Sequence, residues 1–332
     1  MARRLLLLIG LATFCLPLFH SAAYGFQAMF SWTNRYQPVS VPNYDQVGTL
    51  SYYALVLIRQ LSAFAIPAFL FVAGYYAAFT LGRGQRASGW RPLLARVRSL
   101  LWPFLIWTIV ALALLWKPPT VDEALSIYYF IPLVAQYYLL SLFMVRFAED
   151  RWKALLIVTG LIQLLTRGLR YMEVLGMLPL DMEFLVTLTP IWLFPGRIFY
   201  FTLGLVASMH LGKFRAWLGR TKWFLLVAVI VVASLTFVEY ELVETLSRRA
   251  WLGATFSGVS RDMYAILFIM CFMAFEGVGV PFSKQLDQLG SKSMGIFLIN
   301  TPVIYVLASL MYHKLPWILG QQMLYQLLLI LA

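Results

Sequence analysis

Ten long apolar stretches follow one another along this chain, and they restrict its fold more than any other feature does. A helix needs about 20 mostly apolar residues to cross the roughly 30 Å hydrocarbon core of a bilayer. The pattern therefore predicts an all-α integral membrane protein, with about ten transmembrane helices in one bundle inside a lipid bilayer. The expected spans lie near 5–27, 52–81, 93–116, 126–147, 153–168, 184–208, 222–239, 262–280, 293–312 and 315–332.

The overall composition agrees with a lipid environment. Hydrophobic residues make up 61% of the 332 residues and charged residues 12%, whereas a soluble domain is about 25% charged. The net charge of +12 comes from short Lys and Arg clusters between apolar stretches, so we expect no nucleic-acid partner. Cys15 and Cys271 lie in apolar stretches, so we expect neither a metal nor a redox cofactor. No repeat or linker divides the chain, which predicts a single domain over 1–332.

Basic residues alternate between the two sides of this arrangement with a roughly two-to-one excess on one side, which the positive-inside rule assigns to the cytoplasm. Both termini are then cytoplasmic, and the chain belongs in the cell (inner or plasma) membrane. Aromatic residues near span ends, such as Tyr52 and Tyr53, predict interfacial belts. The side with fewer basic residues, expected to be the outer side, includes Arg261 and Lys314. The side with more basic residues, expected to be cytoplasmic, holds Arg3, Arg4, Arg83, Arg86, Arg91, Arg96, Arg98, Arg146, Arg151, Lys153, Lys213, Arg215, Arg220, Lys222, Lys284 and Lys292.

The N-terminus allows two interpretations. Arg3 and Arg4, the apolar run 5–19 and the small residues of 21–23 resemble a secretory signal peptide with a cleavage site. Because nine further apolar stretches follow, we favour an uncleaved first transmembrane helix.

Polar residues inside the expected spans are functional candidates, because lipid-exposed charge is costly. His20 and Arg59 each lie near the outer end of a span, at a similar depth of roughly 10 Å below the surface. A histidine beside an arginine suits a general base next to a group that stabilises an anion. The alternative is a histidine that bonds a neighbouring helix while Arg59 extends toward the interface.

Four further residues are expected to contact substrate, each with a structural alternative. Arg197 falls near the middle of its expected span and needs an acceptor or an anionic ligand. Asn300, beside Pro302, is either a ligand contact or an interhelical hydrogen-bonding group. Arg96 and Arg98, at the cytoplasmic mouth of the third span, either hold the phosphates of a nucleotide-type donor or serve as a topology signal near anionic lipid.

Several segments, in order along nearly the whole chain, together resemble the acyltransferase 3 family of multi-span enzymes that O-acylate bacterial surface glycans. The 64–75 segment resembles the family's second span, with a Pro, aromatics and then Gly-Tyr. Two positions depart from the family pattern: Ile9 stands where a basic residue precedes the first-span histidine, and Asn300 stands where a histidine often ends the ninth span. The matching segments are 18–21, 64–75, 98–107, 128–140, 197–204 and 293–300.

The resemblance implies a transferase that moves an acyl group, in the first place acetyl, from acyl-CoA to a hydroxyl of an extracytoplasmic envelope glycan. His20 would be the catalytic base and Arg59 the oxyanion-stabilising residue. Arg96 and Arg98 would bind the phosphates of acyl-CoA, and its pantetheine arm would reach toward Arg197. The alternative is a transporter or exporter of a glycan or lipid-linked precursor, because proline-broken spans also suit that class. A membrane scaffold without enzymatic activity is a third hypothesis.

Overall fold

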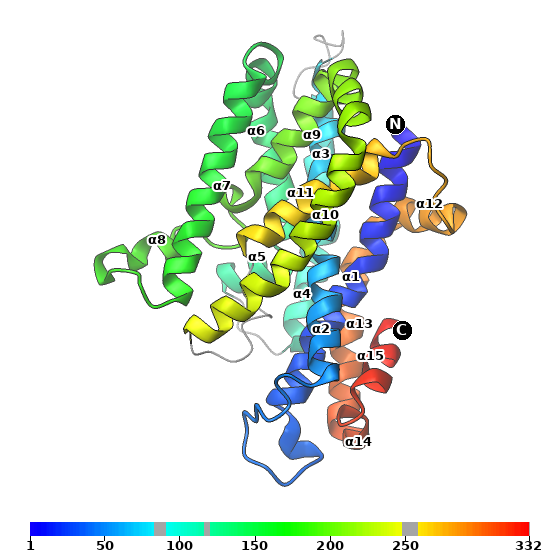
Figure 1. The fold of residues 1–332 in the computed structure, drawn as a ribbon. Coiled ribbons are helices and arrows are strands. Elements are labelled where there is room, and N and C mark those ends of the chain that lie inside the picture. Colours follow the sequence, from blue (N-terminus) through cyan, green and yellow to red (C-terminus); the bar gives the residue numbers. More distant parts are fainter. Residues whose placement is uncertain (83–90, 116–119, 248–257, 332) are drawn as a thin grey trace. The chain divides into compact units, whose positions relative to one another are not determined.

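A computed structural model describes residues 1–82, 91–115, 120–247 and 258–331, and all regular secondary structure in these ranges is helical (Figure 1). The helices are α1 (Ala2–Phe30), η1 (Thr33–Arg35), α2 (Leu50–Leu61), η2 (Ser62–Phe64), α3 (Ala65–Gly82), α4 (Arg91–Leu115), α5 (Val121–Ile127), α6 (Phe130–Asp150), α7 (Trp152–Val174), η3 (Leu180–Met182), α8 (Glu183–Thr187), η4 (Phe194–Arg197), α9 (Ile198–Met209), α10 (Leu211–Ser247), α11 (Val259–Ala274), α12 (Ser283–Ser291), α13 (Ser293–Lys314), α14 (Pro316–Leu319) and α15 (Gln322–Leu331).

Seven helical stretches within the described ranges are long and apolar enough to cross a membrane. They confirm the all-helical, multi-span prediction at these places: Ala2–Phe30, Leu50–Leu81, Arg91–Leu114, Phe130–Asp150, Trp152–Val174, Leu211–Ser247 and Ser293–Lys314. The total of ten and the orientation of the termini stay predictions.

The other three expected spans contain shorter helices. The expectation of one continuous helix over 184–208 is wrong, because α8, a non-helical stretch, η4 and the 12-residue α9 share this range. The 262–280 range holds most of the 16-residue α11, and 315–332 holds α14 and the 10-residue α15. At about 1.5 Å per residue, none of these helices covers 30 Å by itself.

The described chain divides into two compact units. We call unit 1 the ranges Met1–Leu5, Ile66–Val227 and Ile266–Val278, and unit 2 the ranges Leu6–Ala65, Ala228–Ala265 and Gly279–Ala332. The prediction of a single domain over 1–332 stays a prediction.

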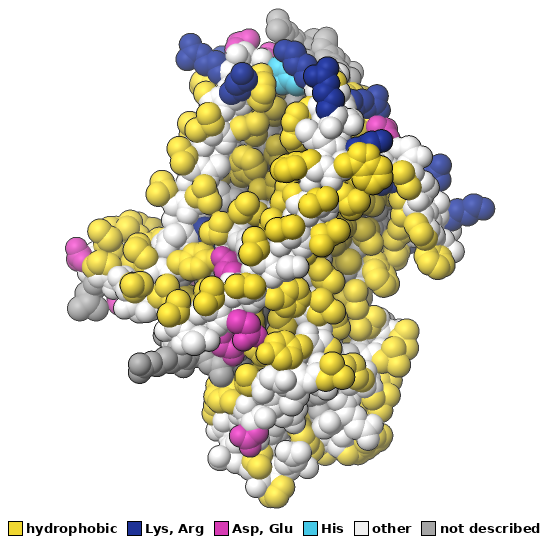
Figure 2. All heavy atoms as spheres, in the orientation of Figure 1, with side chains coloured by type: hydrophobic (Ala, Val, Ile, Leu, Met, Phe, Trp, Pro, Cys, Tyr) yellow, Lys and Arg dark blue, Asp and Glu magenta, His cyan; other side chains and the backbone are white. Residues whose placement is uncertain are grey.

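Unit 1 is built mainly from α3, α4, α6, α7 and α9. Glycines allow α3 and α9 to approach closely, because a Cβ atom on Gly74 would meet the Phe201 carbonyl and one on Gly204 would meet the Phe71 carbonyl. Small residues at such crossings are typical of membrane helix packing. The outer face of α7 is apolar, with Leu165 74% exposed, as expected for a surface in lipid. Figure 2 shows these hydrophobic side chains along α7 and basic side chains where α6 meets α7.

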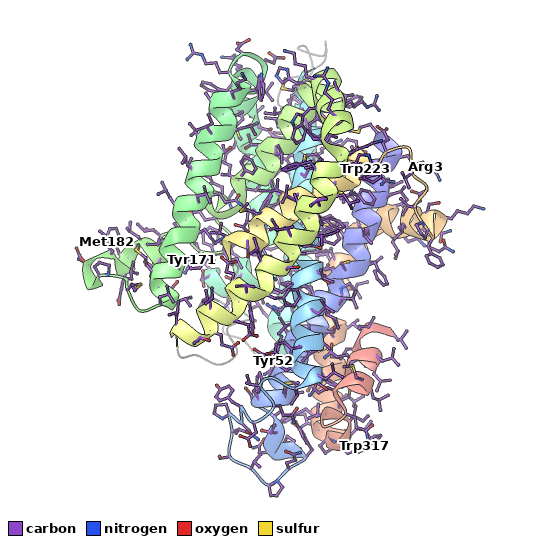
Figure 3. The ribbon with its side chains drawn as sticks, viewed as in Figure 1. Arg3, Tyr52, Tyr171, Met182, Trp223 and Trp317 are labelled. Atoms are coloured by element: carbon purple, nitrogen blue, oxygen red, sulfur yellow. The ribbon has the colours of Figure 1, made fainter. Side chains whose placement is uncertain are left out.

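Unit 2 is built around α1, α2, α13 and α15. The α13 helix runs parallel to α1, because Gly290, just before α13, packs against Leu6, and the Tyr312 ring at the other end lies 5.0 Å from the Trp32 ring. At this second end Gly320 lies against the ring of Tyr36. Figure 3 shows Trp317 in α14 at the same end of unit 2. This end, which we call the aromatic end, is opposite α12.

Candidate functional site

His20 and Arg59 interact within unit 2, as the sequence predicted from their common depth. An electrostatic interaction joins the two side chains, and the Arg59 guanidinium carbon lies 4.5 Å from the centre of the Phe19 ring. Arg59 is buried, with 4% of its surface exposed, so it does not extend into solvent. His20 is half-buried. The pairing places a proton-accepting imidazole beside a buried cation.

A second buried arginine, Arg261, reaches the same aromatic ring. Its guanidinium carbon lies 5.2 Å from the centre of the Phe19 ring, and its side chain is 7% exposed. From the sequence, Arg261 was expected on the outer side, just before the span 262–280, whereas in the structure α11 begins at Val259 and includes it. Because the expected span starts directly after Arg261, hydropathy alone did not place this arginine inside a helix.

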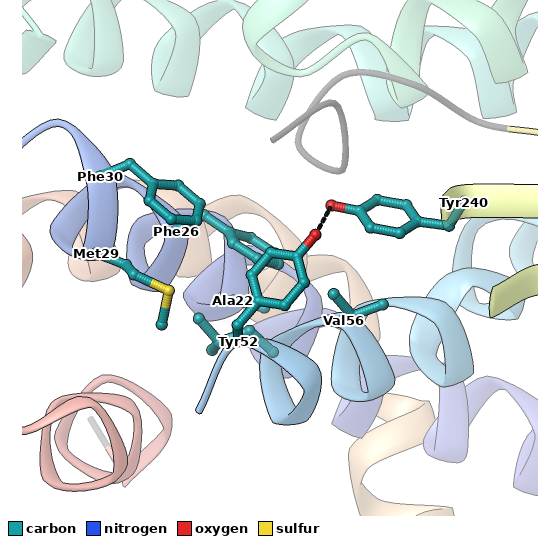
Figure 4. Packing of buried hydrophobic residues seen from close by; sticks show 8 residues of the cluster. Ala22, Phe26, Met29, Phe30, Tyr52, Val56 and Tyr240 are labelled. Carbon is teal, nitrogen blue, oxygen red and sulfur yellow. Dashed lines mark hydrogen bonds between the residues drawn. The ribbon is translucent and has the colours of Figure 1, made fainter. Parts of the chain in front are cut away.

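A buried cluster of two tyrosines and a glutamate lies in the same unit. The Tyr52 hydroxyl donates to Glu244 Oε2 at 2.6 Å and lies 3.2 Å from the Tyr240 hydroxyl. Figure 4 shows the hydroxyl groups of Tyr52 and Tyr240 meeting, with the Tyr52 ring packed against Phe26 of α1. An electrostatic interaction also links Tyr240 with Arg59.

Sequence reasoning missed this cluster. Tyr52 was expected in an interfacial belt, yet its side chain is fully buried, whereas its neighbour Tyr53 is 44% exposed. Tyr240 and Glu244 follow the expected span 222–239 and were not considered, because α10 was expected to end before them. The helix continues to Ser247 and carries both side chains into the unit.

Asn300 lies at the same level of unit 2 as His20. Each residue precedes the Trp32–Tyr312 contact by about 18 Å along its own helix, and the two helices are parallel. Asn300 is 8% exposed, and its Nδ2 has no hydrogen-bond partner among the residues that the structure describes. Three of the predicted site residues, His20, Arg59 and Asn300, therefore lie in unit 2, and His20 interacts with Arg59.

Arg197 lies in unit 1, where it ends η4 directly before α9, so the prediction that it lies in the middle of a continuous helix is wrong. Its guanidinium carbon is 4.7 Å from the centre of the Tyr129 ring, and its Nη1 donates to the Ile191 carbonyl at 3.4 Å. The side chain is half-buried. The Pro195-Gly196 pair just before it breaks the helix, and this leaves backbone groups that need other partners.

Side chains of α6 and α7 supply those partners. Gln136 Nε2 donates to the Trp192 carbonyl at 2.8 Å, while its Oε1 accepts from the Phe194 amide at 3.2 Å. The Tyr137 hydroxyl donates to the Phe194 carbonyl at 2.7 Å. Gln163, which interrupts the apolar pattern of α7, accepts from the Phe199 amide at 3.1 Å. These contacts satisfy a non-helical segment in an apolar bundle, the condition under which such a segment is tolerated in a membrane.

Arg96 and Arg98 lie on α4, also in unit 1, and both are exposed. Arg96 interacts with the hydroxyl of Tyr138, and the adjacent Tyr137 interacts with Arg197. Two consecutive tyrosines of α6 thus connect two of the predicted donor-binding arginines. Residues two apart on a helix point in different directions, so Arg96 and Arg98 suit separate phosphate groups. Arg83 and Arg86, in the same predicted basic cluster, lie outside the described residues.

In chemical terms, unit 2 offers a base beside buried positive charge. A histidine positioned in this way can remove a proton from a hydroxyl, and a cation nearby stabilises the oxyanion that forms when the resulting alkoxide attacks a carbonyl. The exposed and half-buried arginines of unit 1 suit the recognition of phosphates.

Comparison with known proteins adds one match. A family model described as an acyltransferase domain, that of acyltransferase family 3, covers residues 7–332, which is nearly the whole chain. Neither the curated proteins nor the solved structures gave a match.

Proposed function

Since this chain belongs to the acyltransferase 3 family and is a multi-pass membrane acyltransferase, we propose that it moves an acyl group, in the first place acetyl, from acyl-CoA to a hydroxyl of an envelope glycan. The observation that carries the proposal is the interaction of His20 with Arg59 beside Phe19 in unit 2. Acyl transfer to a hydroxyl needs a base and a site for a developing negative charge, and these two side chains match both needs.

In the proposed reaction, the His20 imidazole accepts the proton of the glycan hydroxyl. The hydroxyl oxygen then attacks the thioester carbonyl, and Arg59 stabilises the tetrahedral oxyanion. When the intermediate collapses, the carbon–sulfur bond breaks and the CoA thiolate leaves. The thiolate takes the proton from His20, so the residue returns to its starting state. Arg261, on the same ring as Arg59, adds a second positive charge to this site.

The donor is assigned to unit 1. Acyl-CoA carries several phosphate charges and a long pantetheine arm, and the arginines Arg96, Arg98 and Arg197 offer matching cations. The link from Arg96 through Tyr138 and Tyr137 to Arg197 supports a donor-binding role for this set. The two-to-one bias of basic residues supports an inner-membrane location with the Arg96 end in the cytoplasm, where acyl-CoA is available.

The presence of Ile9 in place of the basic residue of the family pattern affects the proposed mechanism. Members of the family usually carry a basic residue there, and position 9 lies about 16 Å along α1 from His20. That charge would not sit beside the histidine in a straight helix. We propose that Arg59, which interacts with His20, supplies the positive charge for the chemical step.

Mass spectrometry of envelope glycans tests the proposal. Cells that make the wild-type protein, His20→Ala, His313→Ala or no copy are compared. We expect one added acetyl group per modified sugar with the wild type, and transfer reduced roughly 10²–10⁴-fold in His20→Ala, the usual contribution of a general base. His313 is an exposed histidine of the same unit, so His313→Ala is the matched control and should behave as wild type.

Two outcomes would contradict the proposal in different ways. Full acetylation with a folded His20→Ala variant would remove His20 from the reaction. Identical glycans in cells with and without the wild-type protein would exclude an envelope glycan as acceptor.

A further inference from the structure

A row of buried neutral polar side chains lies on α15 in unit 2, and the mechanism above does not use it. Gln322, Tyr325 and Gln326 are spaced at i, i+3 and i+4, so they lie on one face of the helix. Their exposed fractions are 5%, 0% and 4%. Polar side chains that are so deeply buried in an apolar helix are costly unless they are hydrogen-bonded.

Each of these side chains keeps a polar atom without a partner. Gln322 Oε1, the Tyr325 hydroxyl and Gln326 Oε1 have no hydrogen-bond partner within the part of the chain that the structure describes. The amide nitrogens of the two glutamines are occupied, since Gln322 Nε2 donates to the Leu319 carbonyl and Gln326 Nε2 donates to the Ser21 carbonyl. The glutamines are therefore held in place while their oxygens remain available as acceptors.

The row leads from the aromatic end of unit 2 to the level of His20. Gly320, two residues before Gln322, contacts Tyr36 at that end. Farther along α15, Tyr325 interacts electrostatically with Tyr24 of α1, and Gln326 bonds Ser21, the residue after His20.

The facing surface of α13 adds a donor. Ile304 and Ala308 of α13 pack in one buried cluster with Tyr325 of α15. Asn300 lies one turn before Ile304 on the same face, at the level of His20, and its Nδ2 lacks a partner among the described residues. Thus α15 supplies acceptors, and α13 supplies a donor, that have no hydrogen-bond partner among the described residues.

We propose that Gln322, Tyr325 and Gln326, with Asn300, form the acceptor subsite and bind hydroxyl groups of a neutral sugar. A sugar hydroxyl both donates and accepts a hydrogen bond, so neighbouring hydroxyls match oxygen acceptors, a phenolic hydroxyl and an amide donor together. These four side chains are uncharged, which favours a neutral sugar over a uronic acid or a sugar phosphate. The inference rests on the proposed function, because it names the acceptor class of that same site.

Binding of oligosaccharides to the full-length chain in nanodiscs tests this subsite without a need for turnover. The probes are the neutral and the anionic fractions of oligosaccharides released from the envelope of cells lacking the protein. The variants are Tyr325→Phe and Gln322→Leu, and the matched control is Gln321→Leu, since Gln321 is the exposed neighbour. We expect the neutral fraction to bind the wild type and the control equally, and about three- to tenfold more weakly to each of the two subsite variants.

Tyr325→Phe is the decisive variant, because it removes only a hydroxyl that has no partner in the described protein. A purely structural role predicts unchanged binding by this variant. Equal neutral-fraction binding by wild type, Tyr325→Phe and Gln322→Leu would overturn the proposal, as would binding of the anionic fraction alone or of neither fraction. An equal loss in Gln321→Leu would also overturn it.

The proposed function can fail separately. Neutral oligosaccharide that binds through Tyr325 but receives no acyl group from the wild type would leave the subsite standing and reject acyl transfer to that glycan. His20→Ala should retain oligosaccharide binding while it loses transfer.

Discussion

The two units use buried polar side chains in opposite ways. In unit 1, Gln136, Tyr137 and Gln163 hydrogen-bond the backbone of the broken segment before α9. In unit 2, the Tyr325 hydroxyl and the side-chain oxygens of Gln322 and Gln326 have no hydrogen-bond partner among the described residues. Glutamine and tyrosine thus stabilise the broken backbone of unit 1, whereas in unit 2 some of their polar atoms stay unpaired in the described protein, as a ligand-binding role requires.

The charged residues show a similar contrast. The predicted donor arginines of unit 1, Arg96 and Arg98, are exposed, whereas Arg59 and Arg261 of unit 2 are buried against Phe19. An exposed arginine suits the capture of a charged ligand from water. A buried arginine interacts more strongly with a developing charge, because the surrounding dielectric constant is lower. This contrast is consistent with our proposal that unit 1 binds the donor and unit 2 holds the catalytic residues.

The largest expected effect tests this assignment with the same substitution in each unit. Arg59→Ala should lower kcat about 10²–10³-fold, as the loss of an oxyanion-stabilising group does, with little change in KM for acetyl-CoA. Arg197→Ala should mainly raise KM for acetyl-CoA. Steady-state kinetics with the purified chain measures both, and Arg215→Ala, an exposed surface arginine, serves as the control. A lower kcat in Arg197→Ala together with a higher KM in Arg59→Ala would contradict the proposed difference between the two units.

A smaller effect concerns stability and compares two Tyr→Phe substitutions. Tyr137→Phe removes the donor to the Phe194 carbonyl, and a buried carbonyl left without a partner costs about 1–3 kcal/mol. Tyr325→Phe removes a hydroxyl without a partner in the described residues, so the free energy of unfolding should stay the same or rise. Denaturant unfolding in detergent distinguishes the two. Equal destabilisation by both would show that Tyr325 is structural as well.

The smallest effect concerns a surface contact of unit 1 outside the spans. Burial acts to raise the pKa of Glu276, but contacts with the Met1 amino group and Arg215 outweigh it and hold that pKa below its ordinary value. The ion pair therefore stabilises the fold above about pH 4.5 and is lost as the pH falls through the lower folded-state pKa.

Because Glu276 is 35% exposed, solvent screening limits this contribution to a few tenths of a kcal/mol. Glu276→Gln should lower the melting temperature slightly at pH 7, and the difference from wild type should vanish in acid. A large change, comparable to that of Tyr137→Phe, would show that surface charge matters as much as interior hydrogen bonds.

Much of the fold and part of the site follow from the sequence, for identifiable reasons. The long apolar stretches gave the helices because a bilayer core demands such lengths. The common depth of His20 and Arg59 could be derived because helix rise is constant and their spans run in opposite directions. Arg261, Tyr240 and Glu244 were not expected inside helices, because each lies outside the edge of an expected span, where hydropathy does not distinguish a helix extension from a loop.

An all-helical membrane chain of acyltransferase type, with a histidine and an arginine at one depth, is therefore predictable from the sequence. These features depend on local hydropathy, helix geometry and ordered motifs. The break in the helix before Arg197, its hydrogen bonds with Gln136 and Tyr137, and the approach of Arg261 and Arg59 to Phe19 follow only from tertiary packing. Tertiary packing also determines which glutamine oxygens have no hydrogen-bond partner among the described residues. These contacts depend on which side chains from distant segments of the chain meet, and local sequence patterns do not predict such pairs.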